Sequence, residues 1–414
     1  MVNNKNSESF LSYYWKKFKR SKLALFGLGV NTIFILVAIL GYSITPDSTP
    51  LCNTQYIELT KQPPGFKVQM IKLRKNEASH KVGFLTKLFI GERSDYRYLP
   101  ISSYRFEDDQ IYYREFQGKR KRRVTAERKL KITDIVFPLK EGDQPIYMDG
   151  EIVQYQLYDK DTVYSKSIQR IRSEIESNHI YYQKFVLGTD TSGRDMLSRL
   201  MIGARISLSV GIISVIISLL IGVTLGTIAG YSSGYIDDAI VWFINVVWSI
   251  PSILLVVAIS AGLGTGLLQI YIAIGLTMWV EVARVIRGKV KLMRSKSFVE
   301  AGRALGFSKG RIIFRHILPN VMGPILVISI ANFATAIIIE SGLSFLNIGV
   351  QAPIPSWGAM ISDHRNYIIS DKAYLALVPG CTIVILVMSY VLIGKGLKRM
   401  FDARTGEEDI SSVA

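Results

Sequence analysis

Few residues of this 414-residue chain are of the types that perform catalysis. The four histidines, His80, His179, His316 and His364, are scattered, and no paired catalytic or metal-binding site is evident around them. The sequence also lacks the G-x-x-x-x-G-K-[ST] loop that holds the phosphates of ATP. Residue types therefore predict no metal site and a chain that is not itself an enzyme.

A polar and basic stretch between two apolar runs is the strongest functional signal. It reads EAGRALGFSKGRIIFRHILP and spans residues 300–319. Ser297 and Glu300 have the S-x-x-E spacing of a capping box, which predicts that a helix begins here. Gly306 is expected to end that helix in the left-handed conformation, and Ser308 to cap a second helix. We therefore predict a helix, a turn and a second helix.

Small residues in the first of these helices indicate contact with another protein. Ala301, Gly302 and Ala304 are expected to make one side of the helix thin, so that a partner can approach closely. Pro319 is tolerated early in a helix and marks the start of the next apolar run. The charged hairpin is thus predicted to be a docking element.

Six apolar runs must position this hairpin. About 20 apolar residues in a helix match the hydrocarbon core of a bilayer, which is about 30 Å thick. Soluble cores seldom need several runs of that length, so the sequence predicts an all-α polytopic membrane protein with about six transmembrane helices. Pro251 is expected to kink the third run. The runs are 24–44, 206–230, 241–263, 267–286, 319–340 and 373–394.

The positive charge predicts the orientation. The net charge is +17, and short segments rich in Lys and Arg remain in the cytoplasm. Three such clusters fall on one side if there are six crossings, which places both termini and the hairpin in the cytoplasm. The clusters are Lys16 to Lys22, Arg284 to Arg315, and Lys395 to Arg404.

A long polar block separates the first and second runs. Residues 47–185 contain no apolar run of spanning length, and we predict a small mixed α/β insert outside the cytoplasm. Segments 131–140 and 150–164 have the composition of strands, whereas 167–185 repeats Ile at helical spacing. The basic run 118–129 favours a solvated face over nucleic-acid or lipid binding, because no aromatic residues interleave with its charges.

The hairpin resembles the EAA loop of ABC importer permeases, a coupling helix that docks into a separate ATPase in that family. Glu300, Ala301, Gly306, Leu318 and Pro319 match the family pattern. The chain departs from it in two places: Gly302 stands where a third alanine is usual, and His316 where isoleucine is usual. The resemblance implies that the ATPase-coupling residues are Ser297, Glu300, Ala301, Gly302, Ala304, Gly306, Leu318 and Pro319.

Two further stretches narrow the family. Residues 186–211 and 342–363, together with the start of the first run, resemble the C-type permease subunit of dipeptide, oligopeptide and nickel importers. The resemblance implies that these outer segments lie near the mouth of the translocation pathway and contact a binding protein, through Gly188, Asp190, Gly193, Arg194, Asp195 and Trp357.

Residue types alone favour structural roles for the same segments. Residues 188–195 read as a polar turn, 196–208 as an amphipathic helix on the outer surface, and Trp357 as an interfacial anchor beside a rigid loop.

The apolar runs and the distribution of charge predict an organisation in five parts, of which the resemblance covers about 5–46 and 186–405 but not the polar block. Residues 1–23 form a cytoplasmic segment, 24–46 the first transmembrane helix and 47–185 the insert. Residues 186–394 form the permease core, with five transmembrane helices and the coupling loop 288–318, and 395–414 form a cytoplasmic tail.

Scarcity of charge within the apolar runs bears on the energy source. Glu281, Arg284 and Glu340 lie toward the ends of runs, whereas ion-coupled transporters carry ionisable residues near the bilayer midplane. This argues against coupling to protons or sodium. The expected function is therefore an importer permease driven by ATP hydrolysis in a partner ATPase. That partner is expected to bind the ATP and magnesium, and this chain is expected to hold no cofactor.

The implied assembly is a heterodimer with a sister permease in the bacterial cytoplasmic (inner) membrane, with cytoplasmic ABC ATPases, an extracytoplasmic solute-binding protein and membrane lipid, but no nucleic acid. The implied cargo is a dipeptide or oligopeptide. Two alternatives remain: a permease of the same class for nickel or another small solute, and a membrane-anchored binding or signalling module based on the insert.

Overall fold

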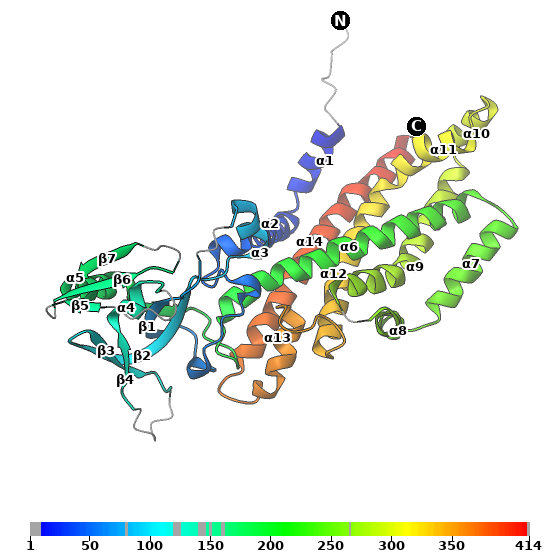
Figure 1. Cartoon of the computed structure of the whole chain (residues 1–414). Helices are drawn as coiled ribbons and strands as arrows, with labels where there is room; N and C mark the ends of the chain where they lie inside the picture. The colour runs from blue at the N-terminus through cyan, green and yellow to red at the C-terminus, as the bar shows by residue number, and fades with distance from the viewer. Residues whose placement is uncertain are drawn as a thin grey trace, which may run out of the picture. The chain divides into compact units, whose positions relative to one another are not determined.

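The computed structural model describes residues 10–78, 82–118, 126–139, 146–148, 151–158, 162–264 and 266–411. The chain divides into two compact units. The first comprises residues 1–38, 203–365 and 376–414, and the second comprises residues 39–202 and 366–375. Figure 1 traces the chain through both units. His80 and the basic residues 119–125 lie outside the described ranges.

Long apolar helices dominate the first unit. Within the described residues, five are long and apolar enough to cross a membrane, which agrees with the prediction of a multi-pass membrane protein. They are α2 (Lys22–Ile44), α6 (Met196–Tyr231), α9 (Leu267–Arg294), the Lys309–Phe345 stretch that ends in α12 (Leu318–Phe345), and α14 (Tyr374–Ser411). Shorter helices include α1 (Phe10–Lys19) and α13 (Trp357–His364).

The third apolar run does not form one helix. Residues 241–263 lie in α7 (Tyr235–Trp248) and α8 (Ser252–Leu263), which are bent by 88° at the break between them. Pro251, the N-cap of α8, has no N–H to continue the α7 ladder, and its ring keeps the preceding residue from helical geometry. The described residues therefore hold five spanning helices, or six if the bent pair counts as one span.

The second span begins earlier than its apolar run. α6 continues without interruption from Met196, so the separate surface helix considered for residues 196–208 is wrong. Ser198 and Arg199 in its first turn are buried, so the polar side chains that suggested a solvated face lie inside the protein.

Glycines at four-residue spacing join two of the spans. Gly222, Gly226 and Gly230 of α6 lie so close to α9 that added Cβ atoms would stand 2.5 to 2.6 Å from their nearest atoms there. A side chain at these positions would force the helices apart. This stripe therefore serves the packing of α6 against α9 within one bundle.

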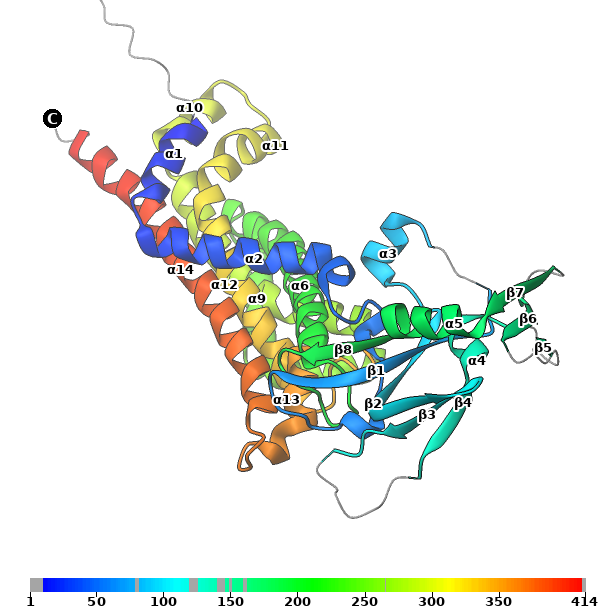
Figure 2. The ribbon, with the colours of Figure 1, turned by 90° about the vertical axis from the view of Figure 1, so that its left-hand side faces the viewer.

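The second unit contains both strands and helices. Its larger sheet is antiparallel, in the order β4-β3-β2-β1-β8, and Figure 2 shows β1, β2 and β8 side by side. Buried side chains such as Ile71, Ile101, Ile132 and Ile171 form its core with the helices α4 (Ile132–Val136) and α5 (Ile168–Glu174). The strands of this sheet are β1 (Phe66–Arg74), β2 (Tyr96–Glu107), β3 (Gln110–Glu115), β4 (Arg128–Lys131) and β8 (Ile180–Phe185).

Three shorter strands form a second sheet, in the order β5-β6-β7. They are β5 (Ile146–Met148), β6 (Ile152–Gln156) and β7 (Val163–Ser167), so the strands predicted within 150–164 are confirmed. The helices of this unit are α3 (Phe84–Ile90), α4 (Ile132–Val136) and α5 (Ile168–Glu174). The position of the insert outside the cytoplasm stays a prediction.

Two local predictions for the insert are wrong in part. Residues 132–136, predicted as strand, form α4, whose Ile132 and Ile135 are fully buried in the core. The helix predicted over 167–185 stops at His179, and β8 follows, because residues 180–185 pair with β1 along their whole length. Burial and pairing with distant segments override local preference in both cases.

Candidate functional site

The predicted helical hairpin is present. α10 (Ser297–Ala304) is followed by a turn and by α11 (Lys309–Ile312). The capping box predicted for its start is wrong, because Lys296 occupies the N-cap position and no side chain caps the helix. The first bond instead comes from backbone: the N–H of Val299 donates to the carbonyl oxygen of Lys296 at 3.0 Å.

The turn after α10 ends the helix as predicted. Gly306 has a φ of 73°, the left-handed conformation that glycine adopts without strain. Its N–H donates to Arg303 O at 2.9 Å, and the N–H of Phe307 donates to Gly302 O at 3.0 Å. This pair of bonds is a Schellman motif, which satisfies the last carbonyl groups of α10.

The second helix leads directly into a span. Ser308 caps α11, as predicted, by accepting a bond from the N–H of Arg311 at 3.4 Å. A π-helical turn, Ile313–Ile317, then joins α11 to α12, and Pro319 lies in the first turn of α12. Any movement of α11 is therefore passed to α12 without an intervening flexible loop.

The inner side of the hairpin is apolar. Val299 and Ile312 pack with Val290 of α9 and Val321 of α12 in one buried cluster. Gly302 is also buried, and a Cβ built on it would lie 3.4 Å from the ring of Phe307. The structure thus corrects the expectation that Gly302 belongs to the thin outer face, because it faces the hairpin's own core.

The outer side exposes large apolar side chains among cations. Leu305 and Phe314 are each 73% exposed and Phe298 is 40% exposed, while Glu300, Ala301 and Ala304 are exposed beside them. An apolar centre with a charged rim is typical of protein interfaces. The hairpin surface is defined here as Phe298, Leu305 and Phe314 with the exposed cations Arg303, Lys309, Arg311 and Arg315.

Arginines fix the base of the hairpin to neighbouring helices. Arg287 of α9 makes two hydrogen bonds to Asp237 of α7, at 2.6 and 2.7 Å, and Arg294 donates to Ser232 O at 2.9 Å. The guanidinium of Arg303 lies 5.6 Å from the ring centre of Tyr231. Sequence reasoning missed this role of Asp237, since its partner is distant in the chain and no local pattern identifies it.

In the second unit, the predicted polar turn at 188–195 is built around Asp190. Its carboxylate accepts bonds from the backbone N–H groups of Ser192 and Arg194, at 2.8 and 2.9 Å. It also pairs with the side chain of Arg194 at 2.6 Å, and with Arg199 at 3.7 Å. Asp190 is 1% exposed, so this turn holds its charges inside the protein.

Glycines seat the turn against neighbouring backbone. Gly188 and Gly193 both have a φ of 75°, and a Cβ on Gly193 would overlap the carbonyl group of Tyr56. Asp195 follows the turn, and its Oδ2 accepts bonds from the N–H of Ser198 at 2.7 Å and from its hydroxyl at 2.5 Å. Burial raises the pKa of Asp195 above its ordinary value, against the lowering effect of these bonds.

Trp357 is not an interfacial anchor. Its side chain is fully buried in the first unit, beside Gly203 and edge-to-face with Phe34 at 5.8 Å. An anchor needs a solvated polar edge, so that interpretation is wrong. Contact of a binding protein with the segments around Trp357 and around residues 188–195 stays a prediction. Because the named side chains of these segments are buried, such a contact would be made by the exposed residues around them.

Serine side chains surround one buried carboxylate, that of Glu340. The sequence alone placed this residue only near the end of an apolar run. Glu340 of α12 is fully buried and accepts bonds from Ser344 at 2.8 Å, Ser341 at 3.4 Å and Ser207 at 3.5 Å. Ser207 belongs to α6, so the carboxylate ties two spans together. Serine is common in membrane helices, and the sequence carries no signal for this grouping.

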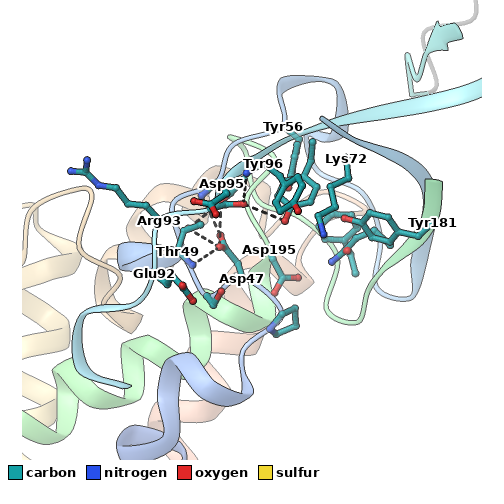
Figure 3. A pocket seen from close by; sticks show the side chains of 17 residues that line it. Asp47, Thr49, Tyr56, Lys72, Glu92, Arg93, Asp95, Tyr96, Tyr181 and Asp195 are labelled. Carbon is teal, nitrogen blue, oxygen red and sulfur yellow. Dashed lines mark hydrogen bonds between the residues drawn. The ribbon is translucent and has the colours of Figure 1, made fainter. Parts of the chain in front are cut away.

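A polar pocket of about 300 Å³ opens in the second unit, and Figure 3 shows its labelled side chains. Two of its carboxylates already form ion pairs. Asp95 binds Arg74 at 2.8 Å, and Glu92 binds Lys87 at 2.5 Å. The pocket is also lined by Asp47, Thr49, Tyr56, Lys72, Arg93, Tyr96, Tyr98, Tyr181 and Asp195.

Two further charged side chains of that pocket, Lys72 and Asp47, also make contacts within the protein. The ammonium group of Lys72 lies 3.9 Å from the ring centre of Tyr96, and the Asp47 carboxylate accepts bonds from the backbone and hydroxyl of Thr49. These contacts hold the loop after α2 and the sheet in place. The hairpin is therefore the element that offers the more accessible surface to a partner.

Comparison with known proteins identifies the family. The model of the binding-protein-dependent transport system inner membrane component matches residues 222–407, and that of the N-terminal TM domain of oligopeptide transport permease C matches residues 9–64. The dipeptide transport system permease protein DppC of Alkalihalophilus pseudofirmus is 43% identical over 217 residues, which are 52% of this chain and 71% of that protein. The chain belongs to the family of binding-protein-dependent transport system inner membrane components, which are permeases.

Other relatives of the permease have related names. The oligopeptide transport system permease protein OppC of Escherichia coli K12 is 39% identical over 231 residues, 56% of this chain and 74% of that protein. The glutathione transport system permease protein GsiD of Salmonella paratyphi A is 39% identical over 217 residues, 52% of this chain and 71% of that protein. The resemblance inferred from the sequence motifs is thus confirmed.

Among solved structures, an inward-facing form of the MetNI methionine ABC transporter is 18% identical to the permease. It covers 50% of this chain and 97% of its own, at a TM-score of 0.42. The hairpin lies within the region that the first family model matches, whereas residues 65–221 lie outside both matches.

Proposed function

We propose that this permease is one transmembrane subunit of an ATP-driven importer of peptides, forms half of the translocation pathway, and couples to a separate ATPase through the α10–α11 hairpin. The names of its relatives support a peptide cargo. The observation that carries the coupling role is the hairpin surface, where Leu305 and Phe314 are each 73% exposed in a segment too charged to lie in lipid.

The hairpin is suited to transmit motion. Its inner side packs on α9 and α12 through Val299 and Ile312, and α11 continues into α12 through the π-helical turn. A push on the hairpin surface by an ATPase would therefore move two spans together. This requires only a rigid link and no chemistry from the permease, so ATP and magnesium belong to the ATPase.

The break between α7 and α8 is the best candidate for the wall of the pathway. A pocket of about 200 Å³ lies there, lined in part by Pro251, Thr277, Glu281 and Thr335. Non-helical backbone at membrane depth is tolerated where it lines a cavity. We assign the remaining half of the pathway to a sister permease, and delivery of the peptide to an extracytoplasmic binding protein.

The test uses Leu305→Asp, with Glu300→Lys as a second variant, in the whole transporter reconstituted in proteoliposomes. Loss of an interface anchor typically weakens docking by about 2 kcal/mol, or roughly thirtyfold. We expect both variants to insert normally, to lose co-purification with the ATPase, and to lose ATP-dependent peptide uptake.

The matched control is Ile369→Asp, which places the same charge at a 99% exposed apolar residue outside the hairpin. Uptake should persist in this variant. Normal uptake and normal co-purification in Leu305→Asp would rule out the coupling role. Co-purification with an ATPase but uptake of a solute other than peptide would leave the coupling role standing and overturn the cargo.

A further inference from the structure

A short helix of the second unit exposes four large apolar side chains. α3 (Phe84–Ile90) has the sequence FLTKLFI. Phe84 is 73% exposed, Leu85 67%, Phe89 58% and Ile90 61%, whereas Leu88 is buried. Val82, just before the helix, is also exposed. Clusters of this kind on a protein surface mark a site of contact with an apolar partner.

Backbone contacts place this helix at the end of a membrane span. The first spanning helix, α2, ends at Ile44, and Ser48 follows in the next loop. The N–H of Glu92, just after α3, donates to Ser48 O at 3.0 Å. Gly91 packs so tightly on this loop that an added Cβ would lie 2.7 Å from Ser48 O. The C-terminal end of α3 is thus fixed against the loop that follows α2.

The neighbouring surface is already apolar. In the part of α2 that belongs to the second unit, Ile39, Leu40 and Ile44 expose 49, 42 and 45% of their surfaces. In a multi-pass membrane protein such a surface faces lipid. The contacts at Ser48 bring the end of α3 beside the loop that follows α2, and this proximity to the end of a span favours lipid over a protein as the occupant.

The polar residues of α3 suit the boundary between lipid and water. Lys87 lies in the middle of the helix, and its ammonium group pairs with Glu92 at 2.5 Å. This pairing neutralises its charge close to the membrane surface. A helix with an apolar side and few charges lies in the plane of the interface rather than across it, and α3 is far too short to span a bilayer.

We propose that α3 lies in the membrane–water interface next to the end of α2, with Phe84, Leu85 and Ile90 inserted among the lipids of that leaflet. The occupant of this surface is lipid, and the insert is thereby attached to the bilayer at a point of its own, besides its connections to the spans. This inference does not depend on which solute the permease transports.

The test measures the surroundings of α3 in the full chain in lipid nanodiscs. Leu85→Cys and Ile90→Cys are each labelled with a nitroxide after Cys381→Ser, since Cys52 is buried and Cys381 is exposed. Collisions with oxygen, which concentrates in lipid, and with a water-soluble nickel complex are then compared. Val163→Cys on β7 is the matched control, because Val163 is an apolar side chain of the same unit with 61% exposure.

We expect labels at 85 and 90 to collide several-fold more with oxygen than with nickel, and the label at 163 to show the reverse. Nickel accessibility equal to that at 163 would place α3 in water and overturn the proposal. Protection from both reagents would show that a protein or a second copy of the chain covers α3, and would overturn it as well. Both labelled positions are exposed, so the substitutions do not disturb the fold.

Discussion

The hairpin around α10 and the turn at residues 188–195 are both polar motifs of the permease, and they use their charges in opposite ways. The hairpin exposes large apolar side chains together with cations. The turn buries Asp190, Arg194 and Asp195, and it pairs Asp190 with Arg194 within the protein. A charged motif near a span is therefore a partner site in one place and an internal brace in the other, and burial distinguishes them.

The largest effect is expected where a buried charge loses its partner. Asp190→Ala leaves the Arg194 guanidinium without its carboxylate in a site where both side chains are under 10% exposed. Breaking such a pair costs about 3–5 kcal/mol. We expect a strong fall in the unfolding temperature in nanodiscs and faster hydrogen exchange over 188–200.

The control for that change is Glu115→Ala, which removes the partner of Arg128, a side chain that is 61% exposed. An exposed pair is worth less than about 1 kcal/mol. Equal destabilisation by the two variants would show that burial does not separate the two kinds of motif.

A smaller effect is expected in the turn of the hairpin. Gly306→Ala puts a Cβ into the left-handed conformation, at a cost of about 1–2 kcal/mol. We expect the bulk unfolding temperature to stay nearly constant, because the strain is local, while ATP-dependent uptake falls. Gly310→Ala is the control, since Gly310 is exposed and lies in helical α11. Uptake lowered equally by both would mean that the turn geometry is not what matters.

The buried Asp195 predicts a dependence on pH. The pKa of Asp195 is raised in the folded protein, so its protonated form contributes to the stability of the fold. This contribution is fully present below the ordinary pKa of aspartate, which is about 4, and it is lost as the pH rises through the raised pKa. Hydrogen exchange over 188–200, corrected for its intrinsic rate, should quicken from mildly acidic to neutral pH. Asp195→Asn should flatten this slope, and an unchanged slope would assign it to another group.

The smallest effect is expected at the inner side of the hairpin. Gly302→Ala adds a Cβ at an ordinary contact distance from Phe307 and improves helix propensity by up to about 1 kcal/mol. Uptake should stay unchanged and α10 should exchange hydrogen more slowly. Loss of uptake would show that Gly302 belongs to the docking surface, and the distinction between the inner and outer sides of the hairpin would then be wrong.

Local signals explain why much of the hairpin could be predicted. Gly306 ends α10 and Ser308 caps α11 because each acts on backbone within a few residues. Ser297 was misplaced by one position, since Lys296 supplies the N-cap and its carbonyl group suffices. The coupling roles of Ser297, Glu300, Ala301, Ala304, Leu318 and Pro319 stay predictions for the uptake experiment to decide.

The sequence by itself determined the membrane class, the apolar spans, the family and the helix–turn–helix, because run length, charge and local capping are all properties of neighbouring residues. Only the tertiary structure decided that Gly302 faces inward, that Glu340 is held by serines of two helices, and that Asp237 binds Arg287. It also decided that residues 180–185 form a strand. These outcomes depend on contacts between residues far apart in the chain, which no local spacing specifies.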